Sequence, residues 1–512
     1  MSHHRAARLA GRGRAMARAS RPLAALLVAA LGWPGQAAAQ ATPPAATQAA
    51  PSAAVDALLE RIRGALPKDA TLEIGQRLDE AGGVTRLRAV VLRQGREETR
   101  IEEVVLQGAS AERVDSAEGQ GLRVTVPDDR LNLAMARFEV TELVLPPAGQ
   151  PFDWTAVTLD SAGVEGVALE DKEADIQAGL QRVAVRQWGG GRPGDARLDG
   201  LSVRGTSDGV GAIDLSVREV ALSGFDLPGT AAAMAAGVMP RPPATAQGSR
   251  LEMGGLAVTL DAAPLAALDR LRLEGGADPS RAGSETGRLA LEGLRLNLPD
   301  ELGGSQLDEL GYKGVAGGLT MAARTEDSGR HLFLEPLQID LSEMGRLELR
   351  MEMTELPPRE PGQVIDPIGQ LMAYPQARLV GLTFSYQDAG LAPRLMAQQA
   401  ALSGVPEQQY RESLAAGVLA MPAPWSGPGA GGAPAARKPG AGAPKGGAGV
   451  AMGGPSPEER AVREAVARFL RQPGRLTLAL NPPQPLRLGE MQGAVMAPGG
   501  PVRVLGLTAT AE

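Results

Sequence analysis

The sequence predicts a mainly β protein: a long, strongly twisted antiparallel sheet of many short kinked strands, with a few helices near its ends. Gly and Pro together number 106 of 512 residues, whereas aromatic residues are only 3%, a composition suited to strands and turns. Runs of alternating Leu recur along the chain, as half-buried strands require. These runs are interrupted at one or two points, and the interruption usually contains Gly.

The clearest run is residues 288–298. Leu289 and Leu291 alternate with small or polar residues, and Leu294 resumes the alternation one residue out of phase. A bulge at Gly293 would keep all these leucines on one face, since a bulge inserts one extra residue into a strand. A related run occupies 250–260, shorter ones begin at Arg197, Arg346, Arg378 and Arg475, and the run 213–227 shifts phase at Arg218-Glu219 and at Gly224. Repeated kinks predict strong twist.

Residues 1–39 have the pattern of a Sec-type signal peptide. Basic residues up to Arg21 precede the short apolar run 23–31, and Ala37-Ala38-Ala39 offers a cleavage site. The apolar run is about half of the ~20 residues that a membrane span needs. We therefore expect cleavage near Ala39, a periplasmic protein and no integral span in the mature chain. Met16 is an alternative start.

The next stretches are a disordered lead-in at 40–54 and an N-terminal helix with a β-rich repeat domain at 55–386. Ser52 can cap a helix that runs to about Leu66, with Val55, Leu58, Leu59 and Ile62 on one face. Strand-like runs then follow almost without interruption. Residues 228–248 predict a loop with one helical turn.

The C-terminal part changes period. Residues 387–420 predict a helical hairpin around Gly404-Val405-Pro406, and 421–455 predict a disordered Pro/Gly/Ala-rich insertion. Residues 456–512 predict one more helix and strands that complete the β fold. That helix opens with the capping box Ser456 to Glu459. The strands are expected at 476–480, 486–488 and 502–507.

Two isolated residues could suggest hydrolase chemistry. Ser207 lies in Gly205-Thr206-Ser207-Asp208-Gly209, which matches the GxSxG of a nucleophile elbow, but that elbow needs a strand followed by a helix. Strand-like residues flank the motif on both sides, which favours a hairpin turn. His331, the only histidine after residue 39, opens an alternating run and is predicted to be a surface strand residue.

The other polar and aromatic groups also have structural interpretations. The acidic run 170–175 is typical of a solvated turn, and Met344, Met351 and Met353 of core packing. Trp154, Trp188 and Trp425 lie in or beside turns, where they could pack at a rim or form a ligand platform. No phosphate-binding glycine loop or metal-ligand spacing is present. We expect no catalytic, cofactor-binding or metal site, and no cofactor.

Charge and cysteine content narrow the function further. Without residues 1–39 the chain has 46 basic and 59 acidic side chains, and 46 minus 59 gives a net charge of −13. This charge gives no electrostatic reason to bind nucleic acid. The absence of cysteine removes disulfides, thiolate catalysis and a lipoprotein anchor.

The chain resembles AsmA-like periplasmic β-rich envelope proteins, in its leader followed by many Leu-x-Leu strands with a Gly kink, such as 287–298 and 345–353. Its ending, from Asp388-Ala389-Gly390-Leu391 to Leu476-Thr477-Leu478, also resembles uncharacterised secreted proteins of alphaproteobacterial type. The AsmA-like resemblance implies a long curved sheet whose concave apolar face holds lipid. It transfers no site residues.

Three hypotheses about function are consistent with these features. The first is a non-enzymatic periplasmic envelope protein that binds or conveys lipid, or supports outer-membrane assembly, with lipid or an envelope protein as partner. The alternative is a structural or protein-interaction module whose β core is closed by its own helices. The third, a hydrolase, has the least support. An apolar sheet face left uncovered would distinguish the first from the second.

Overall fold

The computed structural model describes residues 51–67, 69–127, 130–146, 154–207, 211–235, 248–278, 280–300, 304–327, 329–357, 375–420, 456–491, 493 and 500–512. The predicted signal peptide and the 421–455 insertion lie outside these residues. The chain divides into two compact units, residues 1–276 with 362–364 (unit 1) and residues 277–361 with 365–512 (unit 2). The division falls inside the predicted 55–386 domain.

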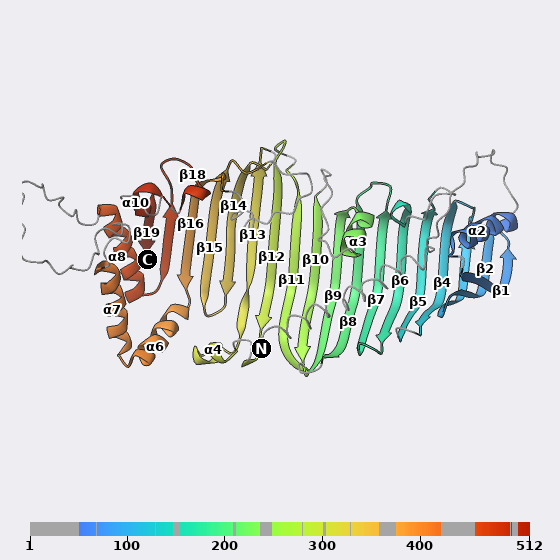
Figure 1. Cartoon of the computed structure of the whole chain (residues 1–512), viewed down its shortest axis with the longest axis horizontal. Helices are drawn as coiled ribbons and strands as arrows, with labels where there is room; N and C mark the ends of the chain where they lie inside the picture. Colours follow the sequence, from blue (N-terminus) through green and yellow to red (C-terminus); the bar gives the residue numbers. More distant parts are fainter. Residues whose placement is uncertain are drawn as a thin grey trace, which may run out of the picture. The chain divides into compact units, whose positions relative to one another are not determined.

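Within the described residues, unit 1 is a meander of strands with two α-helices and one short 3-10 helix. Its elements are α2 (Pro51–Ala65), β1 (Ala70–Glu80), β2 (Val84–Gln94), β3 (Glu97–Gln107), β4 (Arg113–Val126), β5 (Leu131–Val144), η1 (Trp154–Ala156), β6 (Leu159–Asp171), β7 (Ile176–Trp188), β8 (Gly194–Ser207), β9 (Gly211–Phe225), α3 (Leu227–Ala235), β10 (Ser249–Leu260) and β11 (Ala263–Ala277). Each strand pairs antiparallel with the next one in the chain, from β1–β2 to β10–β11 (Figure 1). The strands of unit 1 are 11 to 15 residues long, longer than the alternating runs that predict them.

A row of kinks crosses these strands at one level. The backbone is left-handed at Gly121 on β4, Gly166 on β6, Gly200 on β8 and Gly255 on β10, with φ between +64° and +67°. The ladder omits each of these residues together with its cross-strand neighbour; for example, Gln120 pairs with Arg137 and Leu122 with Met135, which skips Gly121 and Ala136. On β2 the same level holds Ala89, with φ +52°.

The kinks keep apolar residues on one face although they shift the alternation. Met135 and Phe138 are three residues apart on β5, yet both are buried in one cluster with Leu122 and Leu133. Val164 and Val167 of β6 pack against the same cluster from either side of their own kink. Two consecutive residues at each kink therefore point to the other face, as in a bulge. The predicted change of phase is confirmed, and unit 1 has one apolar and one polar face.

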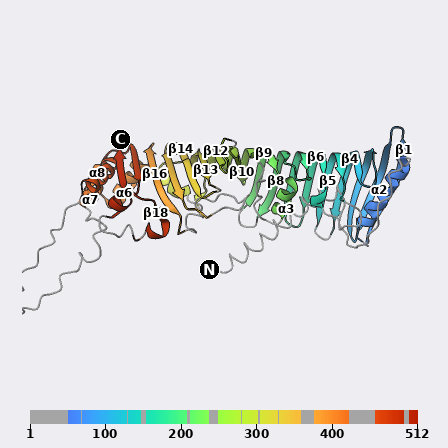
Figure 2. The same ribbon diagram turned by 90° about the horizontal axis from the view of Figure 1, so that it is seen from above.

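Part of the apolar face is covered. One continuous cluster joins α2 to β2–β7, β9 and α3, and it includes Val157 and Leu159, which are 0% and 1% exposed. We call this cluster the covered strip. Both α2 and α3 lie against it (Figure 2). The N-terminal helix is as predicted, although it begins at Pro51. The segment after Phe225 forms the nine-residue helix α3 rather than a single turn, because Pro228 and the alanines that follow favour a helix start.

Unit 2 is also antiparallel. Its elements are β12 (Glu285–Leu296), α4 (Gly304–Glu309), β13 (Val315–Glu326), β14 (His331–Leu341), β15 (Gly345–Thr354), β16 (Arg378–Asp388), α6 (Leu391–Ser403), α7 (Glu407–Ala420), α8 (Pro457–Arg471), β17 (Arg475–Leu480), β18 (Leu486–Arg487), η3 (Leu488–Glu490), α10 (Gly500–Val504) and β19 (Leu507–Ala511). Strands β12 to β17 pair in chain order, β18 pairs with β16 and β19 with β17.

The clearest run of the sequence, residues 288–298, lies mostly in β12. Gly293 has φ +67°, and the pairing with β13 shifts register between Leu291 and Leu294. The predicted bulge at Gly293 is therefore confirmed.

The C-terminal helices agree with the prediction, whereas one strand does not. Helices α6 and α7 form the hairpin, with Gly404 in the left-handed conformation between them. Ser456 and Glu459 form the full capping box of α8. The strand expected at 502–507 is wrong: residues 500–504 form α10, and the strand is 507–511. Pro501 suits the first turn of a helix, and Gly506, with φ +61°, separates the two elements.

The core of unit 2 is rich in methionine. Met351 and Met353 are buried beside Leu332, Leu334 and Leu379, and Met344 is buried separately. Helix α8 covers the end of the sheet, where Phe469 packs near Tyr386 and Ala511. The predicted class is confirmed: the protein is mainly β and antiparallel, with an N-terminal helix, a helical hairpin and one more helix.

Candidate functional site

The GxSxG motif lies in a connection between two strands. Ser207 is the last residue of β8 and pairs with Gly211, the first residue of β9. Strands thus flank the motif on both sides, as the hairpin prediction requires. A nucleophile elbow would continue into a helix.

His331 opens β14 and is half-buried on its strand. Its Nε2 lies 3.0 Å from Oε1 of Glu352, and its ring lies against Phe333 at a centroid distance of 4.1 Å. The structure places His331 in unit 2 and Ser207 in unit 1, within separate strand pairs. His331 thus contacts a residue of its own strand, Phe333, and one of the neighbouring strand β15, Glu352.

The other predicted structural residues have the roles expected of them. The acidic run forms the turn between β6 and β7, where Asp171 Oδ1 accepts hydrogen bonds from the backbone N–H groups of Glu173 and Ala174. Trp188 is 4% exposed in the covered strip, so it packs rather than forming an open platform. Trp425 lies outside the described residues. Within the described ranges, no group of three or more acidic or histidine side chains is placed to hold a metal ion.

The feature that stands out is the apolar face of unit 1 beyond the covered strip. Three cross-strand rows of apolar side chains run from β6 to β11 on this face, and we call them the open band. The rows are Val164–Val183–Leu198–Val220–Met253–Leu271, then Val167–Leu180–Leu201–Val217–Leu256–Leu268, and Leu169–Ala178–Val203–Leu215–Val258–Ala266. Most of these side chains are only half-buried.

Exposure separates the open band from the covered strip. Beneath α2 and α3 the apolar side chains are nearly inaccessible, as Val114 at 2% and Val185 at 6% illustrate. At the margins of the open band, Ile213 is 36% and Leu273 is 47% exposed. Contiguous apolar surface of this extent on a folded protein marks an interaction or ligand-binding surface.

The local sequence explains why the band is continuous. Without the kinks at Gly200 and Gly255, every apolar residue on one side of the kink row would turn to the polar face. Adjacent strands kink at the same level, so Leu198 and Leu201 stay in line with Val220 and Val217. The sequence predicts the kinked runs but not the rows, because rows depend on the register between strands.

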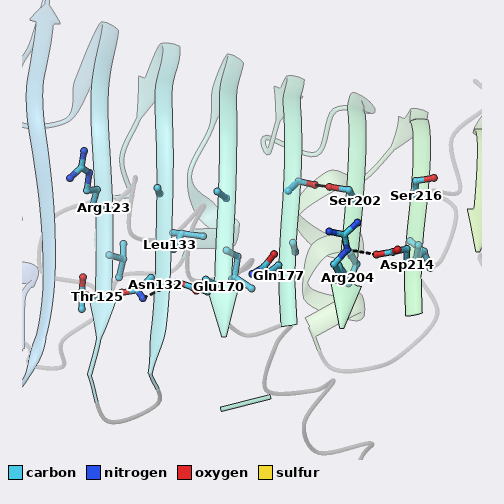
Figure 3. A pocket seen from close by; sticks show the side chains of 18 of the residues that line it. Arg123, Thr125, Asn132, Leu133, Glu170, Gln177, Ser202, Arg204, Asp214 and Ser216 are labelled. Carbon is cyan, nitrogen blue, oxygen red and sulfur yellow. Dashed lines mark hydrogen bonds and ion pairs between the residues drawn. The ribbon is translucent and has the colours of Figure 1, made fainter. Parts of the chain in front are cut away.

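The opposite face of unit 1 has a shallow groove with a volume of about 930 Å³. Its lining includes a row of small residues on β5 to β10, among them Ala134, Ala168 and Gly179. Figure 3 shows polar side chains that line the same groove, such as Arg204 and Asp214. Along one side, Arg204 Nε donates to Asp214 Oδ1 at 2.5 Å, and a longer contact joins Asn132 to Glu170. The polar side chains around the groove thus pair with one another across neighbouring strands.

Arg–carboxylate pairs extend over the rest of the polar face. Glu252 on β10 accepts hydrogen bonds from Arg250 at 2.6 Å and also lies within 3.1 Å of Arg270. The hydrogen bond from Arg250 lowers the pKa of Glu252, and the charges of Arg272 and Arg270 contribute further. Arg88 and Arg86 lower the pKa of Glu103 on β3 in the same way. Such ladders keep the polar face charged and hydrated.

Comparisons with known proteins identify one partial match. A family described only as "Uncharacterized protein" has a model that matches residues 338–433 and 440–512, which lie in the C-terminal part of the chain. No curated protein matches the chain. No solved structure matches it either. Among the described helices, none has both the length and the apolar character that crossing a membrane requires.

Proposed function

We propose that this protein is a non-enzymatic component of a bacterial envelope that binds or conveys lipid through the apolar face of unit 1. The observation that carries the proposal is the open band, three continuous rows on β6 to β11 in which most apolar side chains are half-exposed, although Leu180, Val217 and Leu268 of the middle row are buried. Exposed apolar surface is costly in water at roughly 25 cal/mol per Å². A ligand that covers the band removes that cost.

The dimensions of the band suit an acyl chain. Strands lie about 4.8 Å apart, so the five intervals from β6 to β11 span roughly 24 Å. One leaflet occupies about half of the ~30 Å hydrocarbon core of a bilayer, or ~15 Å. A lipid tail could therefore lie across the strands within the band, with its polar headgroup at the margin.

Export to the periplasm is part of the proposal and rests on residues 1–39. The charged leader, the short apolar run and Ala37-Ala38-Ala39 support it. A chain without cysteine is compatible with an oxidising compartment, because it has no thiol to be oxidised there.

A protein-interaction module with a closed β core is the second candidate, and the covered strip favours it. Helix α2 and helix α3 close part of the apolar face with their own side chains. The half-exposed rows between β6 and β11 favour lipid instead, since Val183 is the one member of these rows that packs, among the described residues, against the cluster formed with α2 and α3. The two candidates differ in what occupies the open band.

Lipid analysis of the purified protein tests the proposal. The full chain, isolated from bacterial envelopes, should carry co-purifying lipid that extraction and mass spectrometry detect in near-stoichiometric amount. Leu201→Asp should abolish most of this lipid because it places a charge in the band. Ser202→Asp, on the next residue and the opposite face, should leave it unchanged.

Melting temperatures of the two variants control for misfolding. Lipid absent from the wild-type protein would contradict the proposal, and so would equal lipid in both variants. A co-purifying protein in place of lipid, lost with Leu201→Asp, would favour the closed-core module.

A further inference from the structure

The apolar face of unit 1 continues from the open band into the covered strip. One row of paired residues runs without a break from β3 to β11: Leu106, Ala117, Val140, Ala162, Val185, Ala196, Leu222, Leu251 and Leu273. Its β3 end lies in the covered strip beside α2, whereas Leu273 at its β11 end is 47% exposed. The covered and open parts are the same surface, made of the same kind of residue.

Helix α2 occupies this surface as an amphipathic ligand would. Val55, Leu58 and Leu59 recur at helical spacing and are 2%, 2% and 6% exposed against the sheet. The residues beneath them include Leu87 and Val90 on β2. The strands below α2 also form ladders with one another, from β2–β3 through β3–β4 to β4–β5.

Two polar side chains fasten α2 in place. Arg61 donates to the backbone oxygen of Ala111 at 2.5 Å and to that of Pro146, near the ends of the strands. Asp56 pairs with Arg77 on β1. Burial of the Arg61 guanidinium lowers its pKa, because the charged side chain loses part of its hydration when it makes these contacts.

On its C-terminal side, helix α2 is joined to β1 by the short connection 66–69. Release of α2 would uncover apolar residues on β2 to β5 and extend the band toward β1 without breaking a strand pair.

We propose that α2 is a displaceable cover, and that the lipid-binding face continues beneath it to β2. The inference rests on the proposed function, because the ligand that displaces α2 is the same acyl chain that occupies the open band. In this structure the β2–β5 part of the face is covered by the protein's own helix α2. Ligand and helix then compete for it.

Arg61→Gln, in the full chain, tests this cover. Gln has a helix propensity close to that of Arg but cannot form the charged hydrogen bonds to Ala111 and Pro146. Hydrogen exchange within residues 51–65 should accelerate about ten- to a hundredfold, the range expected for loss of hydrogen bonds from a charged group. A titration with a fluorescent long-chain fatty acid should show more probe bound per chain than in the wild type.

Arg63→Gln is the matched control, since Arg63 is exposed on the same helix and pairs only with Glu60 of that helix in the described contacts. It should leave both exchange and probe capacity at wild-type values. Saturating probe should also accelerate exchange of α2 in the wild-type protein. If Arg61→Gln lowers the melting temperature of the whole sheet, Asp56→Asn provides a second variant with the same expected results.

The outcomes separate this inference from the proposed function. Faster hydrogen exchange of α2 without an increase in bound probe would contradict the inference that α2 covers part of the lipid-binding face, but it would leave the proposed lipid binding intact. Unchanged exchange in both Arg61→Gln and Asp56→Asn would overturn the role of these contacts as a fastening. If the probe binds neither the wild type nor any variant, the proposed function is contradicted, and so is the inference that α2 is a displaceable cover.

Discussion

Gly255 shows what the kinks demand of single residues. Its φ is +65°, and a Cβ at this position would lie 2.8 Å from the Cβ of Arg218 on the neighbouring strand. Both the left-handed backbone and the close neighbour disfavour a side chain. Gly293 in β12 has the same conformation, with φ +67°, at the bulge opposite β13.

Gly293→Val should therefore destabilise the protein by about 1–3 kcal/mol, since a β-branched residue is strained at positive φ. Ala290→Val, on an ordinary strand position three residues earlier, should cost little because β-branched residues suit strands. Denaturant melts of both variants check this. A harmless Gly293→Val would contradict the steric account of the kink.

Sequence patterns predict such glycines but not their equivalents on other strands. The interrupted Leu alternation predicts the bulge at Gly293 and the phase shifts at Arg218-Glu219 and Gly224, which the pairing confirms. Ala89, Glu142 and Gln187 also have positive φ within or at the ends of strands. Their side chains give no signal of this, because the conformation is imposed by the neighbouring strand.

Strand β1, at the start of the sheet of unit 1, illustrates how an element is protected. Arg77 lies in the row of Leu87 and Val104, and Asp79 lies in the row of Thr85 and Leu106, so charges face the apolar side at this edge. Inward-pointing charges prevent an exposed edge strand from pairing with another chain. Asp79 Oδ1 accepts a hydrogen bond from Thr85, which is 0% exposed, and another from Arg77.

This arrangement predicts a pH dependence. The hydrogen bond from Thr85, followed by that from Arg77, lowers the pKa of Asp79 below its usual value of 3.8. The folded state is thus stabilised by ionised Asp79 above that value, and this stabilisation is lost as the pH falls through the lower, folded pKa. Asp79→Asn should be less stable than the wild type near pH 7, and the difference should shrink below pH 4. Denaturation midpoints across that range measure it; a constant difference would contradict it.

Elements whose ends carry chemical signals were predictable. The capping box at Ser456, the Gly404 break and the apolar stripe of α2 each define a helix in the sequence. Helix α3 and helix α10 were not predicted, since Ala-, Pro- and Gly-rich sequences are compatible with loops as well. Whether these two segments form helices or loops depends on how they pack in the folded protein.

At the scale of the molecule, the sequence predicts a two-faced sheet but not which part of it is covered. Alternation places Leu198, Val220 and Val140 each on the apolar side of its own run. Only the register and the positions of α2 and α3 show that Val140 is buried while Leu198 and Val220 remain half-exposed. The open band, on which the proposed function depends, therefore required the structure.

Site-specific photocrosslinking tests the central claim most directly. A benzophenone amino acid would replace Leu198, in the open band, or Arg197, the adjacent residue on the polar face, where it pairs with Asp199 and Glu219. We predict that irradiation of the full chain in envelopes yields lipid adducts at position 198 and few at 197, as read by mass spectrometry. Equal adducts at the two positions, or none at 198, would contradict a lipid-binding apolar face.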